Sequence, residues 1–130
     1  MKKKYSIIKD FWISSAHSVA GAGKCERIHG HNYKIKFCLE GERLNDKGML
    51  LDFRVIKHEI EKRYDHRLLN DFEEFDTRKD GKSPTTEYFS EVVFNIIRDI
   101  CKEEINEPRV KWVEIQETNE AIAKFELIME

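Results

Sequence analysis

The sequence predicts an α+β domain in which four antiparallel strands form one sheet and two helices cover one of its faces. Two observations lead to this fold class. Apolar and polar residues alternate, as in half-buried strands, near both ends of the chain. Between these segments, apolar residues recur at helical spacing in two stretches that begin near Asp52 and Ser83. The resulting order, β-β-α-α-β-β, favours an antiparallel sheet with both helices on one face.

The composition is typical of one globular domain over residues 1–130. Hydrophobic residues make up 40% of the chain and charged residues 37%, with a net charge of −2. This charge provides no general attraction for nucleic acid, and no apolar segment is long enough to predict a signal peptide or a membrane span. The three cysteines are odd in number and widely spaced, which favours a reducing cytoplasm over a disulfide framework.

The first strand is predicted over residues 4–17. Its apolar residues occupy alternate positions, interrupted by Lys9, and the same phase continues into Ser15 and His17. We therefore expect His17 at the end of this strand, facing the same side as the apolar residues. Residues 18–28 are small and contain glycine, which predicts a loop.

The second strand is predicted to begin at His29 and to end around residues 41–44, before turn-forming residues. Apolar residues alternate along it at Tyr33, Ile35, Phe37 and Leu39. His29 and His31 precede this run in the same phase, so their imidazoles face one side with Cα atoms about 6.5–7 Å apart.

These histidines predict a zinc site. Two imidazoles on one face can converge on a single ion, because Zn–N bonds are about 2.0–2.1 Å long, but two protein ligands are too few for a stable site. An antiparallel pairing of the two strands would add His17. Three histidines with an open fourth position are typical of catalytic rather than structural zinc. The alternative is a polar strand end that contains His29 and His31 incidentally.

The first helix is predicted to begin after Asp52, a suitable N-cap, and to end at Asp65-His66. His58 is expected on its solvated face. An irregular, charged connection follows over residues 66–82. The apolar residues at helical spacing are Phe53, Ile56, Ile60 and Tyr64.

The second helix is predicted to begin within residues 83–87, where Ser83 and Thr85 are alternative N-caps. Residues 106–108 are expected to stop it. Its apolar stripe consists of Phe89, Val92, Val93, Ile96, Ile97 and Ile100. Two last strands are predicted over Val110–Thr118 and Ala121–Met129.

Cys25 is predicted to act as a general base. It lies in the polar loop, four residues before His29. A nearby dication would lower its pKa and maintain a thiolate population at neutral pH, and a thiolate so placed can accept a proton from a substrate. The alternative is an inert buried thiol, which is how we interpret Cys38 and Cys101.

Six short motifs follow one another in the chain. They are Ala16-His17, Cys25 with His29-Gly30-His31-Asn32-Tyr33, Leu51-Asp52-Phe53, Asp65-His66-Arg67-Leu68-Leu69-Asn70, Pro84-Thr85-Thr86-Glu87 and Glu117-Thr118. Together they resemble the 6-pyruvoyl-tetrahydropterin synthase superfamily over essentially the whole chain. Three residues separate Cys25 from the His-Gly-His run, as in its 6-carboxy-tetrahydropterin synthase branch, whereas pyruvoyl synthases typically have five. Phe125 departs from this pattern, since many relatives carry tyrosine there.

The resemblance implies a tunnelling fold (T-fold), zinc, and a homo-oligomer in which trimers close a β-barrel and two trimers stack into a hexamer. The implied activity is that of a carbon–carbon lyase. It converts 7,8-dihydroneopterin triphosphate to 6-carboxy-5,6,7,8-tetrahydropterin, acetaldehyde and triphosphate in queuosine biosynthesis. The alternatives are pyruvoyl-tetrahydropterin synthase activity on the same substrate and a non-catalytic zinc-binding assembly module. Lys24 and Arg27 are candidates for triphosphate contacts only because they flank Cys25.

The resemblance also implies roles for residues outside the histidine strands. Asp65 and His66, otherwise a solvated helix end, would form an acid–base pair that reaches a site on a neighbouring subunit. Glu117 would anchor the pterin ring, because a carboxylate can accept two hydrogen bonds from the N–H pair of such a ring. Thr85 and Thr86 would add weaker substrate contacts.

Overall fold

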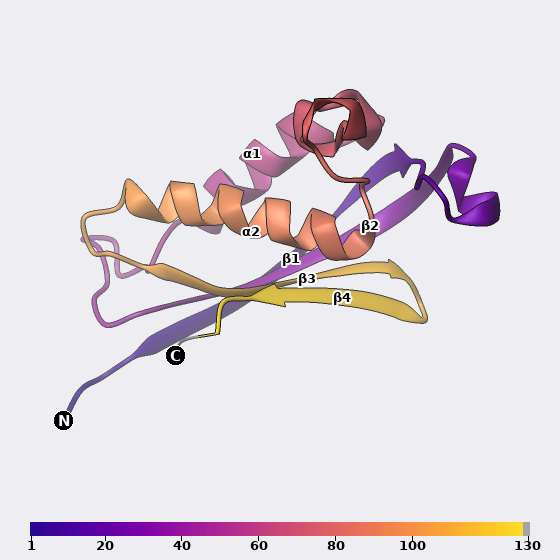
Figure 1. Ribbon diagram of the computed structural model, residues 1–130. Helices are drawn as coiled ribbons and strands as arrows, with labels where there is room; N and C mark the ends of the chain where they lie inside the picture. The colour runs from indigo at the N-terminus through magenta and orange to yellow at the C-terminus, as the bar shows by residue number, and fades with distance from the viewer. Residues whose placement is uncertain (129–130) are drawn as a thin grey trace.

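The computed structural model describes residues 1–128, and these form one antiparallel sheet with strand order β1-β2-β3-β4. Helices α1 and α2 lie together over one face of this sheet (Figure 1). The predicted fold class and element order are therefore confirmed. The elements are β1 (Tyr5–His17), β2 (His29–Gly41), α1 (Phe53–Tyr64), α2 (Thr86–Lys102), β3 (Arg109–Thr118) and β4 (Ala121–Glu126). None of the helices in these residues is long and apolar enough to span a membrane.

Two predicted ends were wrong. Helix α2 ends at Lys102 rather than near Pro108, because the amides of Glu103 and Glu104 turn back to carbonyls of its last turn. Strand β4 ends at Glu126, and of the three further residues predicted for it, Met129 lies outside the described residues. Proline excludes continuation of a helix but does not locate its last turn.

Both irregular connections contain short 3-10 helices. The 18–28 loop includes η1 (Gly23–Glu26). The 66–82 connection includes η2 (Leu69–Asp71), η3 (Glu73–Phe75) and η4 (Thr77–Lys79). Leu69 and Phe75 are fully buried, so this charged connection is attached to the core rather than solvated throughout.

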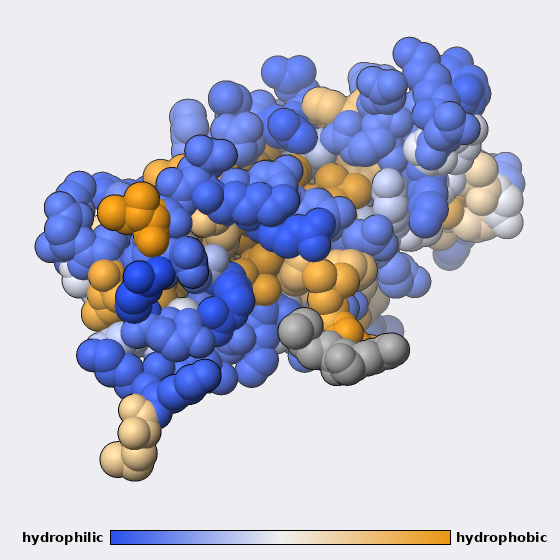
Figure 2. All heavy atoms as spheres, turned by 60° about the vertical axis from the view of Figure 1, so that its left-hand side comes forward, coloured by the Kyte–Doolittle hydropathy of each residue, from blue (hydrophilic) through white to orange (hydrophobic). Residues whose placement is uncertain are grey.

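The core lies between the helices and the inward face of the sheet. The alternation along β1 and β2 buries the predicted apolar phase, including Ile13, Tyr33 and Ile35. Fully burying an apolar side chain of this size contributes about 1.5–3 kcal/mol, so the alternation strongly favours one choice of face. The surface on the side shown in Figure 2 is mostly hydrophilic, with patches of hydrophobic side chains. The same inward phase continues to the histidines at the end of the β1–β2 hairpin.

Thr85, and not Ser83, caps helix α2. Its side-chain oxygen accepts a hydrogen bond from the backbone N–H of Tyr88 at 3.1 Å. We expect Thr85→Ala to lower the free energy of unfolding by about 1 kcal/mol, because one amide of the first turn loses its partner. Urea denaturation measures this, with Ser83→Ala as the matched control that should lose less. Equal losses in the two variants would contradict the assignment of the cap.

Candidate metal centre

The β1–β2 hairpin brings the three predicted histidines together. In its register His17 lies opposite His29, and His31 lies opposite Ser15, one inward-facing position further along. The imidazole centroids are 4.5 Å apart for His17 and His29, 5.0 Å for His17 and His31, and 4.9 Å for His29 and His31. Three imidazoles therefore converge at the end of the hairpin where the loop joins its two strands.

Glu117 of β3 supplies a fourth possible donor. Its Oε1 lies 3.1 Å from Nε2 of His31, and its Oε2 accepts a hydrogen bond from the hydroxyl of Thr86 at the start of α2. One ligand atom from each of the three histidines and from Glu117 lies within 4.8 Å of all the others. This group could hold a metal ion.

Glu117 was predicted as a catalytic and substrate-binding residue, and not as a neighbour of the three histidines. The alternation along β3 could have indicated that Glu117 faces inward. Val113 and Ile115 are fully buried, and Glu117 continues their phase. The pairing of Ile35 with Ile115 then brings this phase next to the histidine phase of β2.

Backbone carbonyls fix the orientation of two of the imidazoles. Nδ1 of His17 lies 2.7 Å from the carbonyl oxygen of Pro84, and Nδ1 of His29 lies 2.7 Å from that of Arg27. A carbonyl only accepts hydrogen bonds, so each Nδ1 carries a proton, and in the neutral form of such a ring Nε2 presents a lone pair. These two Nε2 atoms are 3.0 Å apart. Two lone pairs at this distance repel unless a cation lies between them.

His31 adds a third nitrogen that needs a partner. Its Nε2 is buried and makes no hydrogen bond within the described residues, because the approach of Glu117 lacks hydrogen-bond geometry. Burial lowers the pKa of His31, opposed by the charge of Glu117. Burial also lowers the pKa of His17, opposed by its contact with Pro84. Three imidazoles, two of them oriented by outer hydrogen bonds, with a carboxylate beside them, fit a divalent metal such as zinc.

These lowered pKa values predict that the metal-free protein loses stability in acid. The unfolded imidazoles of His17 and His31 bind protons near their usual pKa of 6.5, whereas the folded ones bind them only at lower pH. The unfolded state therefore holds more protons in acid, so this stability is complete above about pH 6.5 and is lost as the pH falls through the lowered values. Thermal unfolding after chelation, from pH 8 to 5, measures it. An unchanged pH slope in His17→Ala/His31→Ala would contradict the prediction.

Asp65 and His66 lie beside the end of β1 in the same chain. Oδ1 of Asp65 accepts a hydrogen bond from the backbone N–H of Ser14 at 2.8 Å, and its Oδ2 lies 3.1 Å from Nδ1 of His66. His66 has a positive φ of 59°, which is uncommon for a residue other than glycine, and its side chain is exposed. A hollow of about 490 Å³ is lined by residues 14–16, 30–32 and 66–68. His66 and His31 thus border one space.

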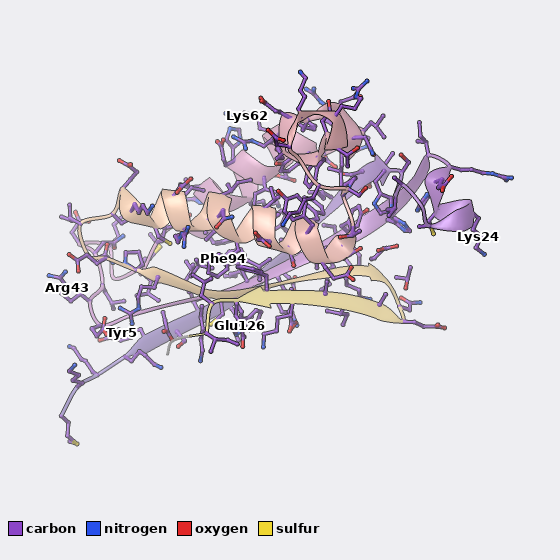
Figure 3. All side chains as sticks on the ribbon, in the orientation of Figure 1. Tyr5, Lys24, Arg43, Lys62, Phe94 and Glu126 are labelled. Atoms are coloured by element: carbon purple, nitrogen blue, oxygen red, sulfur yellow. The ribbon has the colours of Figure 1, made fainter. Side chains whose placement is uncertain are left out.

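Cys25 is separate from the four donors. It lies in η1, is half-buried, and does not belong to the possible metal-binding group found within residues 1–128. Its neighbour Lys24 lies at the far tip of this loop (Figure 3). Cys38 and Cys101 are buried free thiols, and burial raises the pKa of Cys101 to about 11. Such thiols remain protonated at neutral pH, which agrees with the prediction that these two cysteines are inert.

Comparisons with known proteins extend over nearly the whole chain. The family model of 6-pyruvoyl tetrahydropterin synthase matches residues 6–127. The 6-carboxy-5,6,7,8-tetrahydropterin synthase of Bacillus subtilis is 34% identical over 116 residues, which cover 88% of this chain and 80% of the relative. The protein of the same name from Synechocystis sp. is 30% identical over 128 residues, covering 92% and 91%. The structure of Caenorhabditis elegans 6-pyruvoyl tetrahydropterin synthase matches with a TM-score of 0.77 at 24% identity over 98% of both chains, which confirms the tunnelling fold. The chain therefore belongs to the 6-pyruvoyl tetrahydropterin synthase family.

Proposed function

We propose that this protein is a zinc-dependent 6-carboxy-5,6,7,8-tetrahydropterin synthase. It would act as a carbon–carbon lyase that converts 7,8-dihydroneopterin triphosphate to 6-carboxy-5,6,7,8-tetrahydropterin, acetaldehyde and triphosphate in queuosine biosynthesis. The observation that carries this proposal is the three-histidine group, of which one member, His31, borders the same hollow as His66. The two relatives at 34% and 30% identity, which carry this name, support the choice of product.

His17, His29 and His31 would hold the zinc ion, which when bound supplies Lewis acidity toward the hydroxyls of the substrate side chain. The remaining chemistry belongs to residues around this group. Cys25 removes a proton from the side chain, and His66, oriented by the carboxylate of Asp65, returns or relays one. His66 borders the same hollow as His31 of its own chain, which supports a role for this pair at the site of that chain.

Glu117 anchors the pterin ring in this proposal. The hydroxyl of Thr86 donates to one carboxylate oxygen, which fixes the rotamer of Glu117. With three histidines on the metal, the other oxygen is available to the N–H groups of the ring. Thr85 contributes a hydroxyl from the neighbouring N-cap position.

Product analysis tests the proposal. Zinc-loaded protein incubated with 7,8-dihydroneopterin triphosphate should release acetaldehyde and form the 6-carboxy product, as mass spectrometry would show. Formation of 6-pyruvoyl-tetrahydropterin would instead support the alternative synthase activity. Absence of turnover in protein with full zinc content would support a non-catalytic zinc-binding module.

We further propose that the protein is cytoplasmic and forms a homo-oligomer in which trimers pair into a hexamer. The association of copies is supported by the two edge strands of the sheet, which are complementary. Trp12 on β1 is 56% exposed and Ile122 on β4 is 61% exposed, although both are large and apolar. An antiparallel pairing that places Lys124 opposite Asp10 of a second copy also places Ile122 opposite its Trp12. It would continue a row of alternating charge across the outward face of the sheet. That row consists of Asp10, Lys36, Glu114 and Lys124.

The backbone permits this register. Residues 65–68 occupy the outer edge of β1 at Ser14 and Ala16, which leaves residues 5–13 of that edge to another strand. The amide and carbonyl of Ser14 point to this edge, so those of the other even-numbered β1 residues do too. The same alternation holds across the β1–β2, β2–β3 and β3–β4 pairs. It directs the backbone N–H and C=O groups of the even-numbered β4 residues to the free edge of β4. Residues 121–126 would then lie opposite 13–8, within the free part of β1.

This register predicts a specific cross-link. In a Trp12→Cys/Ile122→Cys variant, the two new thiols of neighbouring copies would lie opposite each other with Cα atoms about 5.5 Å apart, within disulfide range. Mild oxidation should therefore produce covalent oligomers on non-reducing gels. Ile8→Cys/Ile122→Cys, displaced by four residues, is the matched control. Equal cross-linking in both variants would contradict the register.

A further inference from the structure

Residues 64–70 run along the end of β1 and form what we call the strap. Hydrogen bonds join the two segments from Ser14 to Ser18, and Leu68 forms a parallel bridge with Ala16. Leu69 is fully buried, which fixes the strap to the core. The strap contacts with residues 14–16 are Ser14 N–H to Asp65 Oδ1, His66 N–H to Ser14 O, Ser15 Oγ to Tyr64 O and Ala16 N–H to Arg67 O.

Asn70 extends this pairing beyond the last residue of β1. Its Oδ1 accepts from the backbone N–H of Ser18 at 2.8 Å, and its Nδ2 donates to the carbonyl of Ser18 at 3.0 Å. A side-chain amide offers the same donor and acceptor as a peptide group, so Asn70 pairs with Ser18 as another strand residue would. Because both bonds are made, they also fix which way the amide points.

Ser18 is the first residue of the loop that carries Cys25. The next residue, Val19, donates its N–H to the carbonyl of Cys25 at 2.8 Å and closes the loop. The place of Cys25 therefore depends on Ser18, and Ser18 is held by Asn70. His17 has supports of its own, because its Nδ1 contacts the carbonyl of Pro84 and lies 3.2 Å from the hydroxyl of Tyr33.

We propose that Asn70 is a positioning residue that attaches the Cys25 loop to the strap bearing Asp65 and His66. One amide thus sets the place of Cys25 relative to the acid–base pair without contact to metal or substrate. For its effect on turnover, the inference rests on the proposed function of Cys25. The attachment itself is measurable in protein that is not turning over.

Two variants of Asn70 separate this role from simple space filling. Asn70→Ala removes both hydrogen bonds. Asn70→Asp keeps the size of the side chain but places an oxygen against the carbonyl of Ser18. The matched control is Asn106→Ala, because Asn106, like the half-buried Asn70, makes two side-chain hydrogen bonds to the backbone, here to the carbonyls of Arg43 and Leu50. Asn106 lies near the start of β3, at the end of the sheet away from the histidines.

Hydrogen exchange and thiol alkylation test the inference in zinc-loaded protein. We expect both Asn70 variants to keep their zinc and to exchange the amides of Ser18 and Val19 about tenfold faster or more, since a lost buried hydrogen bond lowers the cost of local opening. Iodoacetamide should alkylate Cys25 severalfold faster, while buried Cys38 and Cys101 react slowly. In the product assay, kcat should fall about tenfold with KM unchanged.

Asn106→Ala should lower global stability and leave both loop measurements unchanged. The inference would be overturned by unaltered exchange and alkylation in Asn70→Asp, or by the same increases in Asn106→Ala. Failure of the unsubstituted protein to turn over substrate would contradict the proposed function instead, because neither loop measurement requires turnover.

Discussion

Replacing His31 by alanine is expected to remove both the metal and the activity. We expect about one zinc ion per chain in the unsubstituted protein, held by three imidazoles. Nε2 of His31 is buried without a hydrogen-bond partner in the described residues. We therefore expect this nitrogen to bind the metal ion. Loss of an outer hydrogen bond to a metal ligand typically costs 10–100-fold in affinity. We therefore expect loss of the ligand itself to cost more than about 100-fold.

Elemental analysis after dialysis measures this directly, alongside the product assay. His58→Ala is the control, because His58 is exposed on α1, away from the four possible donors. Its zinc content and turnover should match those of the unsubstituted protein. Full zinc retention in His17→Ala, His29→Ala and His31→Ala alike would show that the ion binds elsewhere.

Most of the possible metal-binding group could be predicted, because the positions of its histidines depend on strand phase. The alternation around Ile13 and Tyr33 carries His17, His29 and His31 to the inward face, and a period of two is readable from sequence. The register could not be predicted, because the loop between the strands is too long to define it. Only the structure shows that His17 lies directly opposite His29.

The features that were missed depend on contacts between distant segments. Glu117 reaches the histidines because β3 pairs with β2, and Asn70 meets Ser18 because the strap returns to β1. Neither contact can be predicted from the residues that flank Glu117 or Asn70 in the sequence. The choice between Ser83 and Thr85 as N-cap was similarly undecidable, since both suit the start of a helix. In the fold, the carbonyl of Pro84 contacts Nδ1 of His17, which connects the start of α2 to the candidate metal centre.

Replacing Cys25 by alanine is expected to lower turnover by roughly 10²–10⁴, the usual scale for loss of a positioned base, while substrate still binds. The thiol is half-buried beside the hairpin and lies outside the possible metal-binding group of residues 1–128, so zinc content should not change. Cys38→Ala, which removes a buried thiol of the sheet, is the control and should keep its turnover.

Glu117→Gln should show the opposite pattern, because it changes the residue proposed to hold the ring. The amide can still accept a hydrogen bond from Thr86, but it presents a donor where the pterin edge also donates. An unpaired buried polar group costs about 1–3 kcal/mol, and more where charge is involved, so substrate affinity should fall about tenfold or more. Zinc should remain on the three histidines, and residual turnover should persist at high substrate concentration. Direct binding measurements on both zinc-loaded variants distinguish the roles. Normal affinity in Glu117→Gln, or no substrate binding in Cys25→Ala, would show that anchoring and proton transfer have been assigned to the wrong residues.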